Sequence, residues 1–104
     1  MLRVTRRGEG VYAATKLGVV AFSESLRQEV TRRHVRVAVV EPGATATEIF
    51  SHMRDEGRQQ LLQFLSRVEP LAAEDIADAI AYLVARPRRV AINEVLIRPT
   101  EQEA

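Results

Sequence analysis

The chain has 104 residues, of which 46% are apolar, and its 15 basic and 14 acidic side chains leave a formal net charge of +1. This length fits one domain, and the balanced charge argues against partners held by bulk electrostatics, such as nucleic acid or an anionic membrane surface. The chain has no cysteine, which excludes disulfides, thiol nucleophiles and cysteine zinc sites. No apolar run approaches a membrane helix and the first residues do not form a secretory signal, so we expect a cytoplasmic protein.

The first part of the chain predicts a helix followed by a strand. Residues 1–10 are an irregular lead-in with three arginines and two glycines. Small and apolar residues then recur every three or four positions, which predicts a helix over residues 11–31. Residues 35–41 contain four valines and an alanine, and Pro42-Gly43 ends this run abruptly. A strand that is buried on both faces of a parallel sheet has this composition.

The remainder predicts a loop, two helices and a second strand. Residues 44–70 are mixed and polar, and a leucine stripe within 55–68 suggests a short helix there. Residues 71–86 predict a firmer helix, because they have an apolar face, acidic residues in the first turn and an arginine in the last. Pro87 ends this helix, and residues 90–98 predict the second strand, which a polar tail follows.

This order of elements indicates an α/β fold. Two strands joined through helices form a βαβ unit, which is expected to be parallel and right-handed. Two parallel strands cannot cover both faces of a sheet, so the composition of residues 35–41 calls for a neighbouring strand that these elements do not supply. We therefore expect residues 1–104 to form a single fragment, the C-terminal part of a larger α/β domain.

Tyr12 and Lys16 are the residues best suited to chemistry. Their spacing of four places both side chains on one face of the predicted helix, close enough to interact. A tyrosine hydroxyl is a poor acid or base at neutral pH, and a nearby ammonium favours its ionised form. Such a pair could pass a proton to or from a carbonyl or alcohol oxygen. The alternative is a packed tyrosine beside a solvated lysine, although position 16 holds the only lysine among the fifteen basic residues.

Three motifs together resemble one family. The segment YAATKLGVVAFSESLRQEV resembles the active-site helix of the short-chain dehydrogenase/reductase family, with its YxxxK signature. PGATATEIF matches the family's PGxxxT form, in which a PG turn after the next strand opens the loop over the nicotinamide. NEVLIRPT is similar to the last strand of a subgroup that prefers NADP and acts on small hydroxy acids and related alcohols. The motifs stand in the family's order and span nearly the whole chain.

The resemblance implies a Rossmann-type doubly wound parallel sheet, of which only the C-terminal βαβ part and the active-site helix are present. It implies hydride transfer between a nicotinamide cofactor, NADP in preference to NAD, and a small-molecule carbonyl/alcohol pair. Tyr12 matches the proton donor or acceptor, and Lys16 matches the lysine that stabilises the ionised tyrosine and hydrogen-bonds the nicotinamide ribose. The positions that match cofactor-binding residues are Tyr12, Lys16, Pro42, Gly43, Thr45 and Thr47. The full-length family member is expected to be a homo-oligomer.

Two departures from the family limit this inference. The sequence holds no glycine-rich dinucleotide turn like the family's, and no serine at the position that polarises the substrate carbonyl. Thr5 is the only hydroxyl residue before Tyr12, and it does not match that serine. We therefore expect the isolated chain to have little or no activity. The alternative is a non-catalytic remnant that associates with a partner through its exposed strand and the helix 11–31.

Other motifs are weaker indications of function. Gly8-x-Gly10-x-x-Ala13 fits a dinucleotide fingerprint, but the strand that should precede it would be short and rich in arginine. His34 and His52 are interpreted as solvated loop histidines, since no third ligand for a metal is evident. The basic clusters RRGEG, RRHVR and RPRR are separated by acidic residues and lack interleaved aromatics. We therefore expect no metal, no nucleic-acid partner and no membrane partner.

Overall fold

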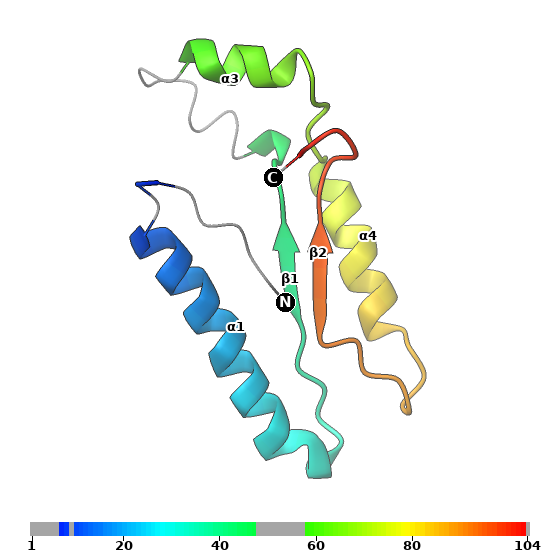
Figure 1. Cartoon of the computed structure of the whole chain (residues 1–104). Helices are drawn as coiled ribbons and strands as arrows, with labels where there is room; N and C mark the ends of the chain where they lie inside the picture. Colours follow the sequence, from blue (N-terminus) through cyan, green and yellow to red (C-terminus); the bar gives the residue numbers. More distant parts are fainter. Residues whose placement is uncertain (1–6, 9, 48–57, 104) are drawn as a thin grey trace.

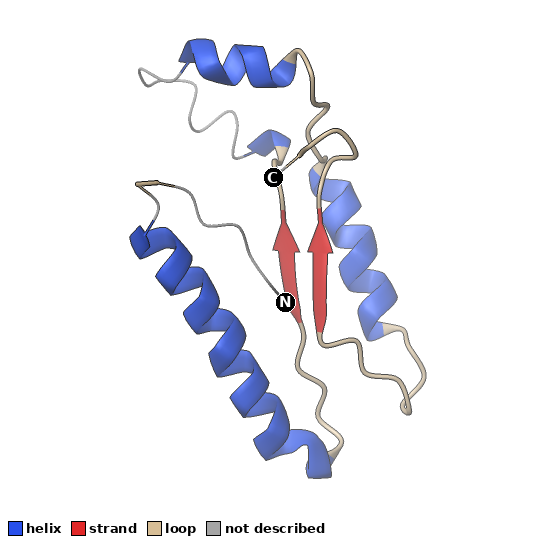
Figure 2. Ribbon diagram, in the orientation of Figure 1, coloured by secondary structure: helices blue, strands red, loops and turns tan. Residues whose placement is uncertain are grey.

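The computed structural model describes residues 7–8, 10–47 and 58–103. Figure 1 shows the elements in chain order, and Figure 2 separates the helices from the strands. The bounds of the elements are α1 Gly10–Val30, η1 Thr31–Arg33, β1 Val39–Pro42, α3 Arg58–Leu65, α4 Ala73–Val84 and β2 Glu94–Ile97.

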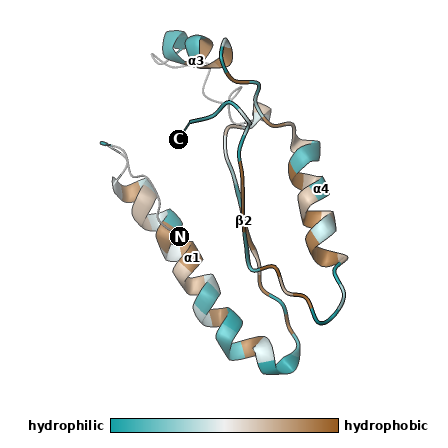
Figure 3. Ribbon diagram, turned by 45° about the vertical axis from the view of Figure 1, so that its right-hand side comes forward, coloured by the Kyte–Doolittle hydropathy of each residue, from teal (hydrophilic) through white to brown (hydrophobic). Residues whose placement is uncertain are grey.

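A two-stranded parallel sheet lies at the centre of the chain. β1 pairs with β2 in a register that sets Val40 beside Val95, and α3 and α4 lie between the two strands in the sequence. The helices α1 and α4 flank this sheet on opposite sides, which is clearest where the sheet is seen edge-on (Figure 3). The predicted parallel βαβ unit is therefore present.

Both strands are shorter than the sequence predicts. The expected strand 35–41 is a strand only at Val39–Pro42, and the expected strand 90–98 only at Glu94–Ile97. The ladder begins where the Val39 N–H donates to the Asn93 oxygen at 2.9 Å, and before that point the described part of the chain offers no strand to pair with. The prediction for the first strand was too long because it relied on β-branched composition alone. The hydrogen-bonded pairing with the second strand determines where it begins.

The helices also begin and end slightly differently from the predictions. The helix expected over 11–31 spans Gly10–Val30, so its first residue lies in the expected lead-in 1–10. The helix expected over 55–68 spans Arg58–Leu65, and residues 55–57 lie outside the described residues. The helix expected over 71–86 spans Ala73–Val84. The Asp75 carboxylate accepts a hydrogen bond from the Ala72 N–H at 2.9 Å, which satisfies one of the free amides at the start of α4.

Arginine side chains bind the carbonyl groups at the other end of α4, where the Arg86 side chain donates to the Tyr82 oxygen at 2.9 Å and Arg36 makes the longer-range contacts. The guanidinium of Arg36, just before β1, donates hydrogen bonds to three main-chain oxygens at and after the last turn of this helix, those of Val84 (3.3 Å), Arg86 (3.1 Å) and Val90 (3.1 Å). The last carbonyls of a helix lack partners within the helix and carry partial negative charge, so a cation there is doubly favourable. Arg36 thereby ties the segment before β1 to the connection that leads into β2.

Very little of the chain is buried. Val68, 4% exposed, and Pro99 are the buried apolar residues among those described, and α1 has no buried residue at all. Phe22 on α1 is 69% exposed. The total accessible surface is 8275 Å², whereas a compact monomer of this mass has roughly 5,900 Å². Apolar faces of α1 and of the sheet are therefore left uncovered. None of the described helices is both long enough and apolar enough to cross a membrane.

We predict that Arg36→Gln lowers the free energy of unfolding by about 1–2 kcal/mol, because the amide cannot supply charge-assisted bonds to three oxygens. The measurement is urea unfolding followed by circular dichroism. Arg33→Gln is the matched control, since Arg33 is exposed and its side chain bonds to none of the described residues. Equal unfolding midpoints for the two variants would contradict the role given to Arg36.

Candidate active site

Tyr12 and Lys16 meet on the first turns of α1. The Lys16 ammonium donates a hydrogen bond to the Tyr12 hydroxyl oxygen at 3.0 Å, and its nitrogen lies 5.1 Å from the centroid of the tyrosine ring. Both residues belong to one helix, so their contact depends on the helix alone and not on distant packing. The Tyr12 side chain is 62% exposed, which leaves the hydroxyl accessible from solvent. The spacing thus produces the contact that the sequence predicts.

The loop that follows β1 is fixed by hydrogen bonds from distant segments. Beyond the last strand residue, the Gly43 N–H donates to the Ile97 oxygen at 2.6 Å and continues the contact with β2. The Ala44 N–H donates to the side-chain oxygen of Gln102 at 3.0 Å. Leu71, just before α4, accepts from Ala46 at 2.9 Å and donates to the Ala44 oxygen at 2.8 Å. Three parts of the chain therefore hold this loop at the carboxyl ends of the strands.

Gly43 is required by this arrangement. A Cβ atom at this position would lie 2.7 Å from the Gln102 side-chain oxygen and 3.3 Å from the Arg98 Cα atom. No side chain fits there without displacing one of these neighbours. The sequence assigns Gly43 to cofactor binding through its PG motif, and the structure adds a structural reason for the glycine. Gln102 was missed by the sequence analysis, because a glutamine in a polar tail gives no sign of a partner 58 residues away.

The two threonines of the PGxxxT motif lie side by side. Their hydroxyl oxygens are 3.3 Å apart, with Thr45 buried at 7% exposure and Thr47 exposed. Thr45 also forms an isolated parallel bridge with Leu71, which anchors it from the backbone side. The hydroxyl of Thr47 is consequently the one of the two that a bound molecule could reach directly.

The Tyr12–Lys16 pair and the loop are two separate parts of the candidate site. The start of α1 and the carboxyl end of β1 lie toward the same end of the molecule (Figure 1). Among the described residues, no hydrogen bond joins the pair to the loop. In open parallel sheets, ligands bind beyond the carboxyl ends of the strands, which is where the loop lies.

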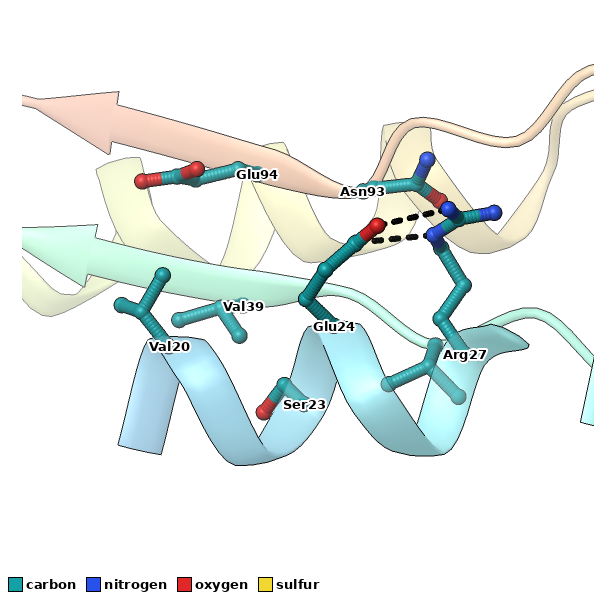
Figure 4. A pocket seen from close by; sticks show the side chains of 8 residues that line it. Val20, Ser23, Glu24, Arg27, Val39, Asn93 and Glu94 are labelled. Carbon is teal, nitrogen blue, oxygen red and sulfur yellow. Dashed lines mark hydrogen bonds and ion pairs between the residues drawn. The ribbon is translucent and has the colours of Figure 1, made fainter. Parts of the chain in front are cut away.

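A cleft of about 160 Å³ lies elsewhere, between α1 and the strands. Figure 4 shows Glu24 and Arg27 of α1 facing each other there, with Asn93 opposite. The two side chains form a bidentate ion pair with distances of 2.8 and 2.6 Å, and this pair together with a bond from Gln28 lowers the pKa of Glu24 to about 2. Valines supply the apolar part of the lining. The cleft is a packing gap beneath α1, and none of the predicted site residues lines it.

The weaker motifs find no support as sites. Gly10 and Ala13 lie within the first turn of α1, so they do not form a turn between a strand and a helix. His34 follows η1 in the left-handed conformation with φ of 61°. His52 lies outside the described residues. In the part of the chain that the structure describes, no three metal-ligating residues cluster.

We predict that Gly43→Ala lowers the free energy of unfolding by about 1–3 kcal/mol, since the added methyl group displaces the Gln102 oxygen and presses against Arg98. Gly18→Ala is the matched control. A Cβ there meets nothing within 4 Å, so the same change should raise stability by about 0.5–1 kcal/mol in the middle of a helix. Urea unfolding measures both. The double change Gly43→Ala with Gln102→Ala should recover part of the loss, and no recovery would contradict the contact with Gln102.

Comparison with known proteins identifies the family. The family model for short chain dehydrogenases matches residues 3–58. Dehydrogenase/reductase SDR family member 11 from Bos taurus is 34% identical over 93 residues, which cover 88% of this chain and 36% of that protein.

Two further relatives carry more specific names. NADP-dependent 3-hydroxy acid dehydrogenase from Schizosaccharomyces pombe is 35% identical over 96 residues, covering 91% of this chain and 37% of that protein. Serine 3-dehydrogenase from Agrobacterium fabrum is 35% identical over 96 residues, covering 91% of this chain and 38% of that protein. The chain thus spans little more than a third of the length of these relatives. With the family model matching more than half of its residues, the chain belongs to the short-chain dehydrogenase/reductase family and holds part of its Rossmann-type α/β fold.

Proposed function

We propose that this chain supplies the proton-transfer pair and the nicotinamide loop of an NAD(P)-dependent oxidoreductase that interconverts a carbonyl and an alcohol. The observation that carries this proposal is the 3.0 Å hydrogen bond from the Lys16 ammonium to the exposed Tyr12 hydroxyl. In the direction of reduction, the Tyr12 hydroxyl gives its proton to the substrate's carbonyl oxygen as that oxygen gains negative charge. In the direction of oxidation, the ionised hydroxyl takes the proton back from the alcohol.

Lys16 is placed to assist proton transfer in both directions. Its ammonium donates to the oxygen on which charge develops when Tyr12 loses its proton, and this stabilises the ionised form. A lysine suits this position better than an arginine, because the ammonium is a compact point charge on a flexible stem. The same group can turn to a ribose hydroxyl, since it has three donors and the described residues engage it only through Tyr12.

The loop after β1 fits a nicotinamide ring. Its backbone is fixed at the carboxyl end of β1, and the exposed Thr47 hydroxyl stands 3.3 Å from that of Thr45. The residues that would hold the cofactor are Tyr12, Lys16, Pro42, Gly43, Thr45 and Thr47. When bound, the nicotinamide supplies or accepts the hydride. We favour NADP over NAD and a small hydroxy acid or alcohol as substrate, because relatives of this chain are named an NADP-dependent 3-hydroxy acid dehydrogenase and a serine 3-dehydrogenase.

The function can be tested in a chimaera, since the isolated chain is expected to have little or no activity. The aligned segment of the Agrobacterium serine 3-dehydrogenase is replaced by the matching residues of this chain, so that the relative supplies the remaining parts of the fold. Tyr12→Phe should lower kcat by about 10²–10⁴-fold, the usual contribution of a proton-transfer group. Tyr82→Phe is the matched control, because it changes the chain's other tyrosine, on α4.

Lys16→Arg in the same chimaera should lower kcat more than about tenfold, although the positive charge is kept. NADPH binding by titration calorimetry is measured beside turnover, so that a loss of proton transfer is separated from a loss of cofactor. Equal turnover of Tyr12→Phe and Tyr82→Phe would contradict the proposed role of Tyr12. Micromolar binding of NADPH by the isolated chain, or its robust turnover, would contradict the expected inactivity.

A second candidate function is association, and the exposed apolar residues of α1 favour it. Val11, Val19 and Phe22 are 84%, 53% and 69% exposed on this helix. Surface of this kind marks a site that another protein covers. We propose that the chain associates with a second copy through α1, whether or not it takes part in catalysis.

We expect sedimentation velocity at about 10–100 µM to show dimers, since exposed apolar surface favours self-association. Phe22→Glu should shift the sedimenting species to monomer. Thr31→Glu adds the same charge at an exposed position directly after the same helix and should leave the dimer intact. A monodisperse monomer of the unaltered chain would rule out association through α1.

A further inference from the structure

Two arginine-rich segments hold six of the fifteen basic residues of the chain. They are residues 32–36 (RRHVR) and residues 86–89 (RPRR), and together they hold six arginines. The chain as a whole has a net charge of +1, so the other residues sum to −5. No aspartate or glutamate occurs in 31–40 or in 79–93, the stretches that contain these segments. The positive charge of these two segments therefore has no acidic neighbour close by in the sequence.

The fold brings the two segments together. Arg36 of the first segment hydrogen-bonds the main-chain oxygen of Arg86 in the second at 3.1 Å. It also reaches the Val90 oxygen at 3.1 Å, just beyond that segment. Both segments lie where chain enters the parallel strands, whereas the loop of the candidate active site lies at the strands' other ends (Figure 1). We call this surface, residues 32–36 and 86–89, the basic end.

Four arginines at the basic end are available to a ligand: Arg32, Arg33, Arg88 and Arg89. All four are exposed. Within the described ranges the ion pair recorded is Glu24–Arg27, and these four arginines have no acidic partner. The other two arginines have structural contacts, as Arg36 holds the end of α4 and Arg86 stacks 3.8 Å from the centroid of the Tyr82 ring. Unpaired guanidinium groups bind phosphate and carboxylate oxygens in bidentate fashion.

We infer that the basic end binds the phosphate backbone of nucleic acid, without reading bases. A protein partner would require an apolar centre, and the only large apolar side chain of the two segments is Val35, which is half exposed. Binding in a membrane surface calls for large apolar or aromatic side chains beside the cations, and the segments contain no Phe, Trp, Leu or Ile. Interfaces with nucleic acid are distinguished by a high density of positive charge, which this surface has.

The net charge of the chain predicts no nucleic-acid partner, and so do the acidic residues that separate its basic clusters in the sequence and the lack of interleaved aromatics. The lack of aromatics argues against stacking on bases, which backbone binding does not require. The hydrogen bonds of Arg36 remove the second of these objections, because they join two clusters separated by about fifty residues. The first objection concerns the average over the molecule, whereas binding depends on the local potential within about a Debye length.

The test is fluorescence anisotropy of a labelled duplex of about 20 base pairs with the full chain, at 50 to 200 mM KCl. Four phosphate contacts predict a slope of log K against log salt of about −3.6. Either double variant, R32Q/R33Q or R88Q/R89Q, should halve this slope and weaken binding about 100-fold at 50 mM KCl. The matched control R58Q/R67Q makes the same change of charge at two exposed arginines outside the basic end, and should change binding less than threefold.

Circular dichroism of each variant checks that its helices are kept, so that a loss of binding is distinguished from a loss of fold. No binding of the unaltered chain at 50 mM KCl overturns the inference, and so does an equal loss in the control variant. Vesicles containing phosphatidylserine and a polyglutamate competitor complete the test. Tighter binding to the vesicles through the same arginines overturns the inference in favour of a membrane surface. If polyglutamate displaces the chain as well as unlabelled duplex does at the same concentration of negative charge, the inferred role of phosphate is overturned.

Discussion

The parallel pairing of β1 with β2 is the contact on which the rest of the structure depends. A parallel ladder puts the carboxyl ends of both strands at one end of the molecule and the amino ends at the other. At the carboxyl ends, the Gly43 N–H continues the ladder to the Ile97 oxygen and starts the loop of the candidate active site. At the amino ends, Arg36 reaches across to the end of α4 and secures the connection that leads into β2.

The two parts of the candidate active site are held by different physical means. The Tyr12–Lys16 contact depends on one turn of α1 and would persist wherever that helix is formed. The loop after β1 depends on partners far along the chain, above all Gln102, and is correct only when the sheet is formed. α1 itself buries none of its residues, so the described residues do not fix the position of the pair relative to the loop by packing. The distance between Tyr12 and Lys16 is thus set within one helix, whereas the distance from this pair to the loop depends on packing between distant segments.

The same distinction explains what the sequence could predict. Helical periodicity placed α1 within one residue at each end, and with it the spacing of Tyr12 and Lys16. The motif PGATATEIF marked the loop, and the family assignment is confirmed by the comparisons. The start of β1 was placed four residues too early, because composition reports β propensity while the pairing with β2 decides where a strand begins. Gln102 and Arg36 were missed because their partners lie about fifty residues or more away and no local pattern marks such a contact.

The distribution of charged residues also differs between the two ends of the parallel strands. A net charge of +1 describes a nearly neutral chain, yet six arginines lie in the two segments at the amino ends and the remaining residues are acidic on balance. The acidic groups Glu74 and Asp75 lie in the first turn of α4, where they favour the positive end of its dipole, and Arg36 contacts its negative end. Acidic side chains thus lie at the start of α4 and arginines at its end, so the two kinds of charge lie toward opposite ends of the strands. Hydride chemistry proposed at one end and phosphate binding proposed at the other use opposite ends of a single parallel ladder, so neither requires the surface of the other.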